Sequence, residues 1–70
     1  EQLLKDIAGL LKLLTDNQRE VLEMRHYMGL SFKEIAEETH VSINTALGRM
    51  RYAVLNLRKM AEERDLVVNF

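Results

Sequence analysis

The sequence predicts an all-α domain, a compact bundle of four short helices. Three observations predict this class: apolar residues recur at helical spacing, helix-capping patterns divide the chain, and no segment alternates apolar and polar residues as a strand would. The chain contains no proline and has 70 residues, which is room for one hydrophobic core. We therefore expect residues 1–70 to form a single domain.

The first two helices are predicted from an apolar stripe and a capping pattern. Leucine and isoleucine recur three or four residues apart through about residues 2–14, which predicts a first helix. Thr15 followed by Gln18 is a capping box, so a second helix should begin near Asp16. Gly29 should end it, because glycine tolerates the left-handed conformation found just past a helix. The apolar side of this helix is expected to carry Val21, Leu22, Met24 and Met28.

The last two helices are predicted to form a helix-turn-helix. Ser31 with Glu34 makes another capping box, and Ser42 restarts a helix only eleven residues after Ser31. A short helix is therefore expected at about residues 32–39, and the last helix should run to about Ala61. Two helices joined by so tight a turn cannot lie parallel, which is the arrangement of a helix-turn-helix.

His40 lies in this tight turn, where a residue with positive φ is expected. Glycine costs least in that conformation, and histidine is among the residues that tolerate it. The alternative role, as a metal ligand or catalytic base, lacks converging partners, because the second imidazole, His26, is on another predicted helix. The chain also has no glycine-rich phosphate loop and no nucleophile beside a base. We expect no catalysis, no metal and no cofactor.

The last predicted helix has a packing face and an outward face when its residues are placed about 100° apart. The residues expected to pack on the other helices are Ala46, Met50, Ala53 and Leu57, flanked by Ile43, Met60 and Ala61. The residues expected to point outward are Asn44, Gly48, Arg51 and Tyr52, bordered by Thr45, Leu47 and Lys59, with Arg49 at the seam. The outward face is thus available to bind a partner.

The segment that contains the last predicted helix has a net positive charge. Residues 39–61 hold four basic and no acidic residues, a net charge of +4, while the remainder holds six basic and eleven acidic residues, a net charge of −5. The whole chain, at −1, hides this asymmetry. Four basic residues can simply be a solvated helix face, which is the plainer explanation.

The outward side chains favour DNA as the partner. Arginine can bond guanine bidentately, asparagine can pair with adenine, and tyrosine can stack or contact a phosphate. Asn44, Arg51 and Tyr52 are these residue types on one face, and Gly48 allows close approach. Lys33, at the start of the preceding helix, is placed to touch a phosphate, although it is equally well an ordinary surface lysine. We expect sequence-specific binding in a major groove.

The segment from Leu14 to Lys59 resembles the C-terminal promoter-recognition domain, region 4, of bacterial RNA polymerase sigma factors, especially the extracytoplasmic-function type. The residues that carry the resemblance are Leu14 through Arg25, the corner Gly29-Leu30-Ser31, Glu34-Ile35-Ala36, Ser42, Thr45, and Arg49 with Ala53. The resemblance implies binding to the minus 35 promoter element in transcription initiation, docking on the flap of the polymerase beta subunit, and an anti-sigma factor as a further partner.

The resemblance also implies roles for individual residues. DNA-reading positions fall at Leu47, Gly48, Arg51 and Tyr52, and backbone contacts fall at Ser42, Thr45 and Arg49. The family commonly has a basic residue where Leu47 stands and serine where Gly48 stands. Hydrogen-bond readout is therefore not expected at these two positions, and Leu47 is expected to meet a thymine methyl group instead. His40 replaces the usual turn glycine.

Two other interpretations stay open from the sequence. The DNA-binding effector domain of quorum-sensing-type regulators and response regulators shares the LT-x-x-x-R-E-V-L start and the EIA helix, but usually has histidine at the match of Arg49. A helical bundle that binds only proteins would explain the apolar surface of Leu10, Leu13, Leu14 and the 66–70 tail.

Localisation is expected to be cytoplasmic. The chain has no cysteine, no apolar run approaching the roughly 18 residues that span a bilayer, and no signal-peptide pattern. It begins with Glu1 rather than methionine, so we expect a C-terminal piece of a longer protein, without membrane insertion.

Overall fold

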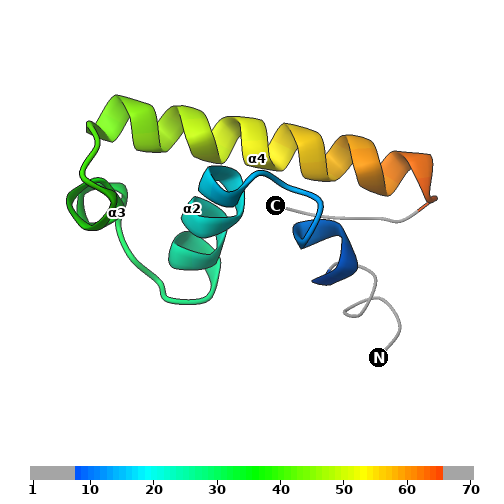
Figure 1. Cartoon of the computed structure of the whole chain (residues 1–70), viewed down its shortest axis with the longest axis horizontal. Helices are drawn as coiled ribbons and strands as arrows, with labels where there is room; N and C mark the ends of the chain where they lie inside the picture. The colour runs from blue at the N-terminus through cyan, green and yellow to red at the C-terminus, as the bar shows by residue number, and fades with distance from the viewer. Residues whose placement is uncertain (1–7, 66–70) are drawn as a thin grey trace.

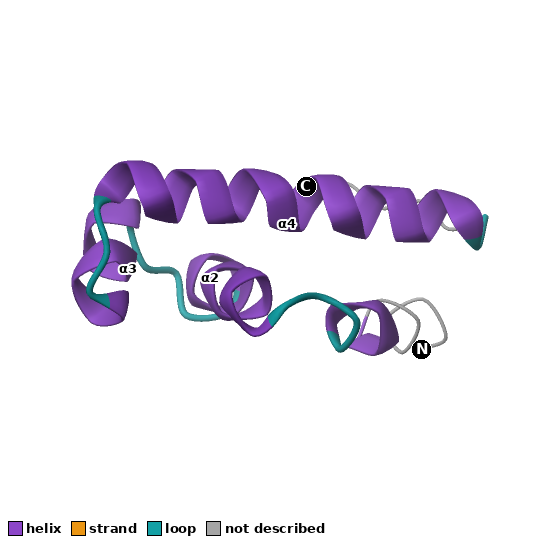
Figure 2. Cartoon of the chain, turned by 45° about the horizontal axis from the view of Figure 1, so that its top comes forward, coloured by secondary structure: helices purple, strands orange, loops and turns teal. Residues whose placement is uncertain are grey.

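The computed structural model describes residues 8–65 and confirms the all-α class. Within that part of the chain, a helical turn at residues 8–11 precedes α2 (Asp16–His26), α3 (Phe32–Thr39) and α4 (Ile43–Glu63), and there is no strand. The long helix α4 lies along one side of the molecule, with α2 beneath its middle and α3 at its N-terminal end (Figure 1). Figure 2 shows α2 almost end-on below α4, so these two helices cross steeply.

The helical segment before α2 ends earlier than the leucine spacing predicts. Helical conformation stops at Leu11, and residues 12–14 form a turn closed by two backbone hydrogen bonds of 2.9 and 3.2 Å between residues three apart. The helix cannot continue to residue 14, because Thr15 is already extended as the N-cap of α2. Leu14 keeps the helical spacing but reaches the core from the turn. The predicted start of this helix lies outside the described residues.

The bounds of α2 agree with the sequence prediction. The Thr15 side chain accepts a hydrogen bond of 3.2 Å from the backbone N–H of Gln18, which satisfies one of the free amides at the helix start. Gly29 has φ +70°, the left-handed conformation predicted for it, and α2 ends three residues earlier, at His26. Met28 is predicted to lie on the apolar side of this helix, and that prediction is wrong. Met28 follows the end of α2, and its side chain is exposed.

Two groups of buried side chains hold the helices together, and α4 contributes to both. The first contains Leu10, Leu11, Leu14, Leu22, Ala53, Leu57 and Ala61. The second contains Val21, Ile35, Ala36 and Ala46. Neighbouring residues of α2, Val21 and Leu22, enter different groups, and Met50 packs against both groups. Packing on α2 and α3 therefore fixes the face that α4 turns outward, as the helical plot of α4 predicts.

The turn between α3 and α4 is a Schellman motif with histidine in the glycine position. His40 has φ 57° and ψ 45°, the left-handed conformation that the sequence predicts. The backbone N–H of Val41 donates to the carbonyl of Ala36 at 3.0 Å, and the Val41 side chain packs on the second buried group. The apolar contact and the αL residue together set the direction in which α4 leaves α3.

Replacing His40 with glycine is expected to stabilise the domain. A non-glycine residue pays a steric cost of roughly 1–2 kcal/mol in the αL region, and part of the gain is lost because glycine makes the unfolded chain more flexible. We expect a net gain of about 0.5–1 kcal/mol by thermal or urea unfolding. The matched control is Thr39→Gly, in the last turn of α3, which should destabilise. A loss of stability in His40→Gly would show that the imidazole makes a contact of greater value.

The capping box predicted at the start of α3 is present. The Ser31 backbone N–H donates to Glu34 Oε1 at 2.9 Å, and the Glu34 backbone N–H donates to Ser31 Oγ at 3.1 Å. The hydrogen bond from the Ser31 backbone, and secondly the Ser31 side chain, lower the pKa of the exposed Glu34 carboxyl below its ordinary value of 4.5.

Acid is therefore expected to loosen the start of α3. Because folding lowers the pKa of Glu34, its stabilising contribution is present above pH 4.5 and is lost as the pH falls through the lower folded value. The carboxyl resonance of Glu34, followed by NMR, should titrate below 4.5. Ser31→Ala removes the hydroxyl but keeps the backbone N–H, so the Glu34 midpoint should rise only part of the way toward 4.5, and an unchanged midpoint would contradict a contribution from the Ser31 side chain.

Candidate nucleic-acid interface

The N-terminus of α4 is capped without using an acidic residue. Ser42 is extended at the N-cap, and its Oγ accepts from the Thr45 backbone N–H at 3.1 Å. The Ser42 hydroxyl also donates to Thr45 Oγ1 at 3.0 Å. The first turns of α2 and α3 contain Asp16 and Glu34, whereas the first turn of α4 contains no acidic residue. The positive end of this 21-residue helix dipole is therefore not neutralised by its own side chains.

The outward face of α4 has the exposure that the sequence predicts. Exposed side chains on it include Asn44, Thr45, Leu47, Arg51, Tyr52 and Lys59. Tyr52 is 61% exposed, and Gly48 and Arg49 are half-buried. Lys33 is exposed on the first turn of α3. The structure thus exposes the predicted residues of α4 except Gly48 and Arg49, which are half-buried, while contact with DNA stays a prediction.

The packing face of α4 is also as predicted, with one correction. Ala46, Ala53, Leu57 and Ala61 are buried, but Ile43, predicted to flank them, is 46% exposed. The bundle does reach the first turn of α4, because Ala46 is 1% exposed and packs with Val21, Ile35 and Ala36. Ile43 lies about 60° round the helix from Ala46, at the edge of the packing face, and this offset leaves its side chain partly exposed.

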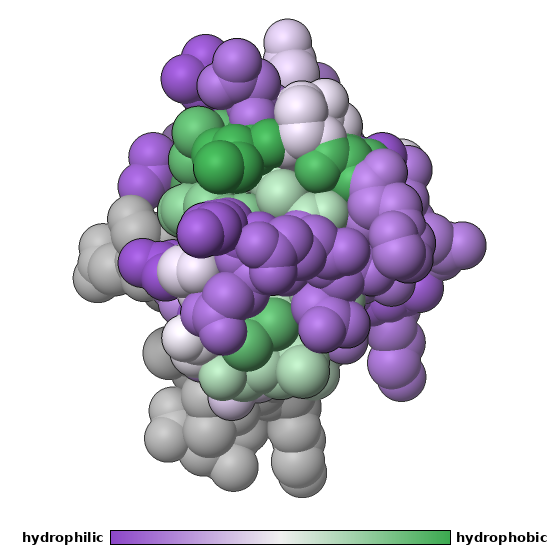
Figure 3. Space-filling model, turned by 90° about the vertical axis from the view of Figure 1, so that its left-hand side faces the viewer, coloured by the Kyte–Doolittle hydropathy of each residue, from purple (hydrophilic) through white to green (hydrophobic). Residues whose placement is uncertain are grey.

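The arginines of this face are not neutralised by neighbouring carboxylates. Within residues 8–65, neither Arg49 nor Arg51 has a carboxylate oxygen within ion-pair distance, whereas Arg19 of α2 pairs with Asp16 at 2.7 Å. In the view toward α3 and the start of α4, hydrophobic surface lies directly beside a band of hydrophilic side chains (Figure 3). This end of the molecule therefore offers unpaired positive charge together with apolar surface.

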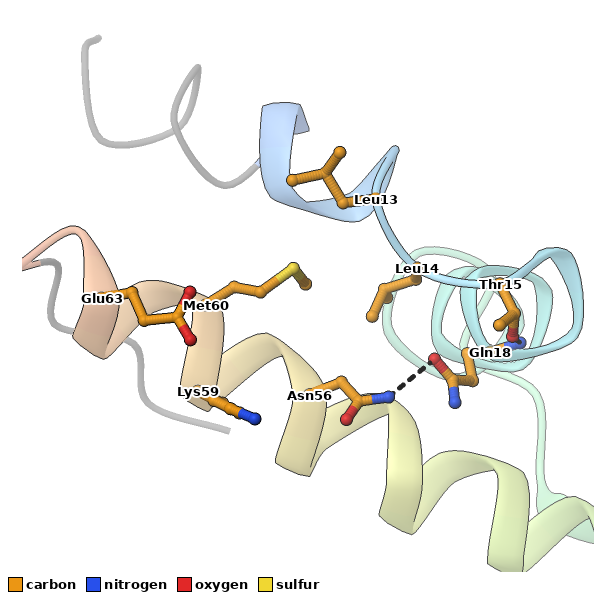
Figure 4. Close-up of a pocket in the computed structure, with 8 residues that line it drawn as sticks. All are labelled: Leu13, Leu14, Thr15, Gln18, Asn56, Lys59, Met60 and Glu63. Atoms are coloured by element: carbon orange, nitrogen blue, oxygen red, sulfur yellow. Dashed lines mark hydrogen bonds between the residues drawn. The ribbon is translucent and has the colours of Figure 1, made fainter.

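A second surface lies at the opposite end of α4. An open pocket of about 270 Å³ is lined by Leu13, Leu14, Thr15, Gln18, Asn56, Lys59, Met60 and Glu63. Figure 4 shows Leu13, Leu14 and Met60 on one side of it, and the Asn56 Nδ2 to Gln18 Oε1 hydrogen bond of 3.1 Å on the other. Leu13 is largely exposed. Leu13 is predicted from the sequence to be apolar surface, but the pocket is not predicted, because Leu13 and Met60 are far apart in the chain.

A helix-turn-helix with an exposed basic face on its second helix defines a DNA-binding domain. The family model "Sigma-70, region 4" matches residues 10–59. The chain therefore belongs to the sigma-70 region 4 family, as the sequence resemblance predicts.

The chain is similar to mycobacterial proteins described as ECF RNA polymerase sigma factor SigK. The protein of Mycolicibacterium vanbaalenii is 38% identical over 53 residues, which cover 76% of this chain and 27% of that protein. The protein of Mycobacterium bovis BCG is 40% identical over 52 residues, which cover 74% of this chain and 28% of that protein. The chain thus spans about a quarter of the length of these curated relatives. The matches do not favour the quorum-sensing-type effector domain or the purely protein-binding bundle.

No helix among the described residues is long and apolar enough to cross a bilayer.

Proposed function

We propose that this chain is the promoter-binding C-terminal domain of a sigma factor and recognises the minus 35 element during transcription initiation by RNA polymerase. The observation that carries the proposal is the outward face of α4. It presents Asn44, Arg51 and Tyr52 on the second helix of a helix-turn-helix, in a chain of the sigma-70 region 4 family. In that fold the N-terminal turns of the second helix enter the major groove.

Each exposed residue of this face has a role in the proposal. Arg51 bonds a guanine edge, Asn44 an adenine edge, and Tyr52 stacks or contacts the sugar-phosphate backbone. Ser42, Thr45 and Arg49 contact phosphates at the start of α4, where the uncompensated helix dipole favours an anion. Lys33 of α3 adds a phosphate contact from the neighbouring helix.

The pocket at the far end of α4 is the proposed contact with RNA polymerase. Leu47 and Met60 are thirteen residues apart in one helix, a separation of about 20 Å, so a protein in the pocket leaves the DNA-facing turns free. Leu13, Leu14 and Met60 offer apolar surface for a hydrophobic segment such as the flap of the beta subunit. An anti-sigma factor covering the same residues would compete with polymerase. A domain with this role is a non-catalytic factor that acts in the bacterial cytoplasm.

Binding to duplex DNA as a function of salt concentration tests the proposal. Duplexes selected from a random library by the chain should bind more tightly than unselected duplexes. The logarithm of the binding constant should fall linearly with the logarithm of the salt concentration, because phosphate contacts release counterions. Failure to enrich any sequence, with no binding even at low salt, would overturn the proposed function.

A further inference from the structure

Two large apolar side chains are exposed together at the start of α4. Ile43 is 46% exposed and Leu47 is 41% exposed. They are four residues apart in one helix, which places them on the same side, one turn above the other. We name this pair the apolar ledge. Its neighbours on the same turns, Asn44 and Arg51, are the polar side chains of the outward face.

Gly48 follows directly after the ledge, and nothing inside the protein requires a glycine there. A Cβ built at Gly48 has no atom within 4 Å, and its φ is not positive. Glycine in a helix interior lowers stability relative to alanine. Gly48 lies about 100° round the helix from Leu47, on the outward face between Asn44 and Tyr52, and there the helix keeps a small loss of stability. The absence of a side chain at Gly48 allows a binding partner to approach the helix backbone closely.

We propose that the apolar ledge reads thymine methyl groups and that Gly48 lets the backbone approach the base edges beside them. This inference rests on the proposed function and adds to it the class of sequence that is bound. The C5-methyl of thymine is the apolar group that a major groove presents. Side chains four apart on a helix are about 5–6 Å from each other, which matches methyl groups within two base-pair steps of about 3.4 Å. The bound element therefore contains two thymines close together, on either strand.

Charge favours DNA over a protein as the occupant of the ledge. Residues 39–61 carry four basic and no acidic side chains, and Arg49 and Arg51 lack ion-pair partners within the described part of the chain. Of these two arginines, Arg51 lies near the ledge, and an apolar protein surface would offer its guanidinium no anion. A duplex meets both requirements, because its phosphates pair with the basic side chains while its thymine methyl groups contact the ledge.

Replacing thymine with deoxyuridine tests the ledge, because it removes the methyl group and leaves the base pairing intact. The tightest duplex from the selection is resynthesised with deoxyuridine at each thymine in turn, and affinity for the chain is measured by fluorescence anisotropy. At one or two positions the affinity should fall about two- to four-fold, the value of one buried methyl group. If no deoxyuridine substitution in a bound duplex changes the affinity, the inference is overturned while the proposed function stands. If no duplex is enriched, both are overturned.

Protein variants assign the effect to the ledge. In Leu47→Ala and Ile43→Ala the deoxyuridine effect should disappear at the matching thymine, since the partner of the methyl group is gone. The matched control is Leu55→Ala, which removes the same side chain from a position of α4 that is 51% exposed but two turns further along. It should keep the full deoxyuridine effect. A deoxyuridine effect of the same size in Leu47→Ala, Ile43→Ala and the unchanged chain would overturn the assignment.

Gly48→Ala should raise the stability of the domain and lower its affinity for DNA. The substitution should raise Tm by about 2–6 °C, because alanine favours the helix and meets no neighbouring atom. It should also weaken binding to the selected duplex at least several-fold, because the new methyl group holds the backbone away from the bases. Higher Tm with unchanged DNA affinity would overturn the close approach at Gly48.

Discussion

Leu57→Ala is expected to cost about 2–5 kcal/mol of folding free energy, the range for truncating a fully buried leucine. Leu57 is completely buried and belongs to the group that joins the 8–14 segment, α2 and α4. A core of this size rarely supplies more than about 3–5 kcal/mol in total. A large fraction of Leu57→Ala should therefore be unfolded at 37 °C, as measured by circular dichroism without denaturant. Urea unfolding followed by the same signal gives the loss of folding free energy.

Leu55→Ala is the matched control for this prediction. It makes the same chemical change two residues away, where the side chain is half exposed and belongs to neither buried group. Its stability should stay within about 0.5 kcal/mol of the unchanged chain. Equal losses in the two variants would show that helix propensity, rather than burial against α2, decides the stability of α4.

Arg51→Ala is expected to reduce affinity for the selected duplex by roughly five- to 150-fold, which corresponds to about 1–3 kcal/mol for one bidentate base contact. The same variant should bind duplexes changed at one base pair nearly as well as the selected duplex, because the discriminating contact is lost. Adding Tyr52→Ala should lower affinity further. Unchanged binding in the double variant would sink the DNA interpretation of the outward face.

Arg58→Ala separates base reading from simple loss of charge. Arg58 is an exposed arginine on the same side of α4, two turns nearer the C-terminus. Its removal should weaken selected and unselected duplexes by similar factors, with a shallower salt dependence and unchanged specificity. Equal effects of Arg51→Ala and Arg58→Ala on specificity would mean that Arg51 contributes only charge.

Helix starts are predictable from this sequence because local chemistry decides them. Thr15, Ser31 and Ser42 all cap helices where predicted, since each hydroxyl satisfies an amide only three residues away. His40 adopts positive φ for a local reason too, the Schellman hydrogen bonds of the α3 end. The packing face of α4 follows from its helical period.

Features that depend on distant contacts are less predictable. Leu14 keeps helical spacing in the sequence but is buried from a turn, because the start of α2 at Asp16 ends the preceding helix. Ile43 is predicted to flank the packing face, yet it is 46% exposed, because the helical period alone does not say how wide the buried face is. The pocket between Leu13 and Met60 depends on the meeting of two segments. Of the candidate site, the sequence predicts which residues are exposed on α4, and their contacts with DNA stay predictions.

An NMR titration of the chain with its selected duplex tests the central claim most directly, because it reports on every backbone amide at once. We expect chemical-shift changes at residues 42–52, with a further change at Lys33. Leu13, Leu14 and Met60, which line the pocket at the far end, should change little. Shifts centred on the pocket residues, or shifts spread evenly over all exposed lysines and arginines, would contradict the claim that α4 enters DNA by its N-terminal turns.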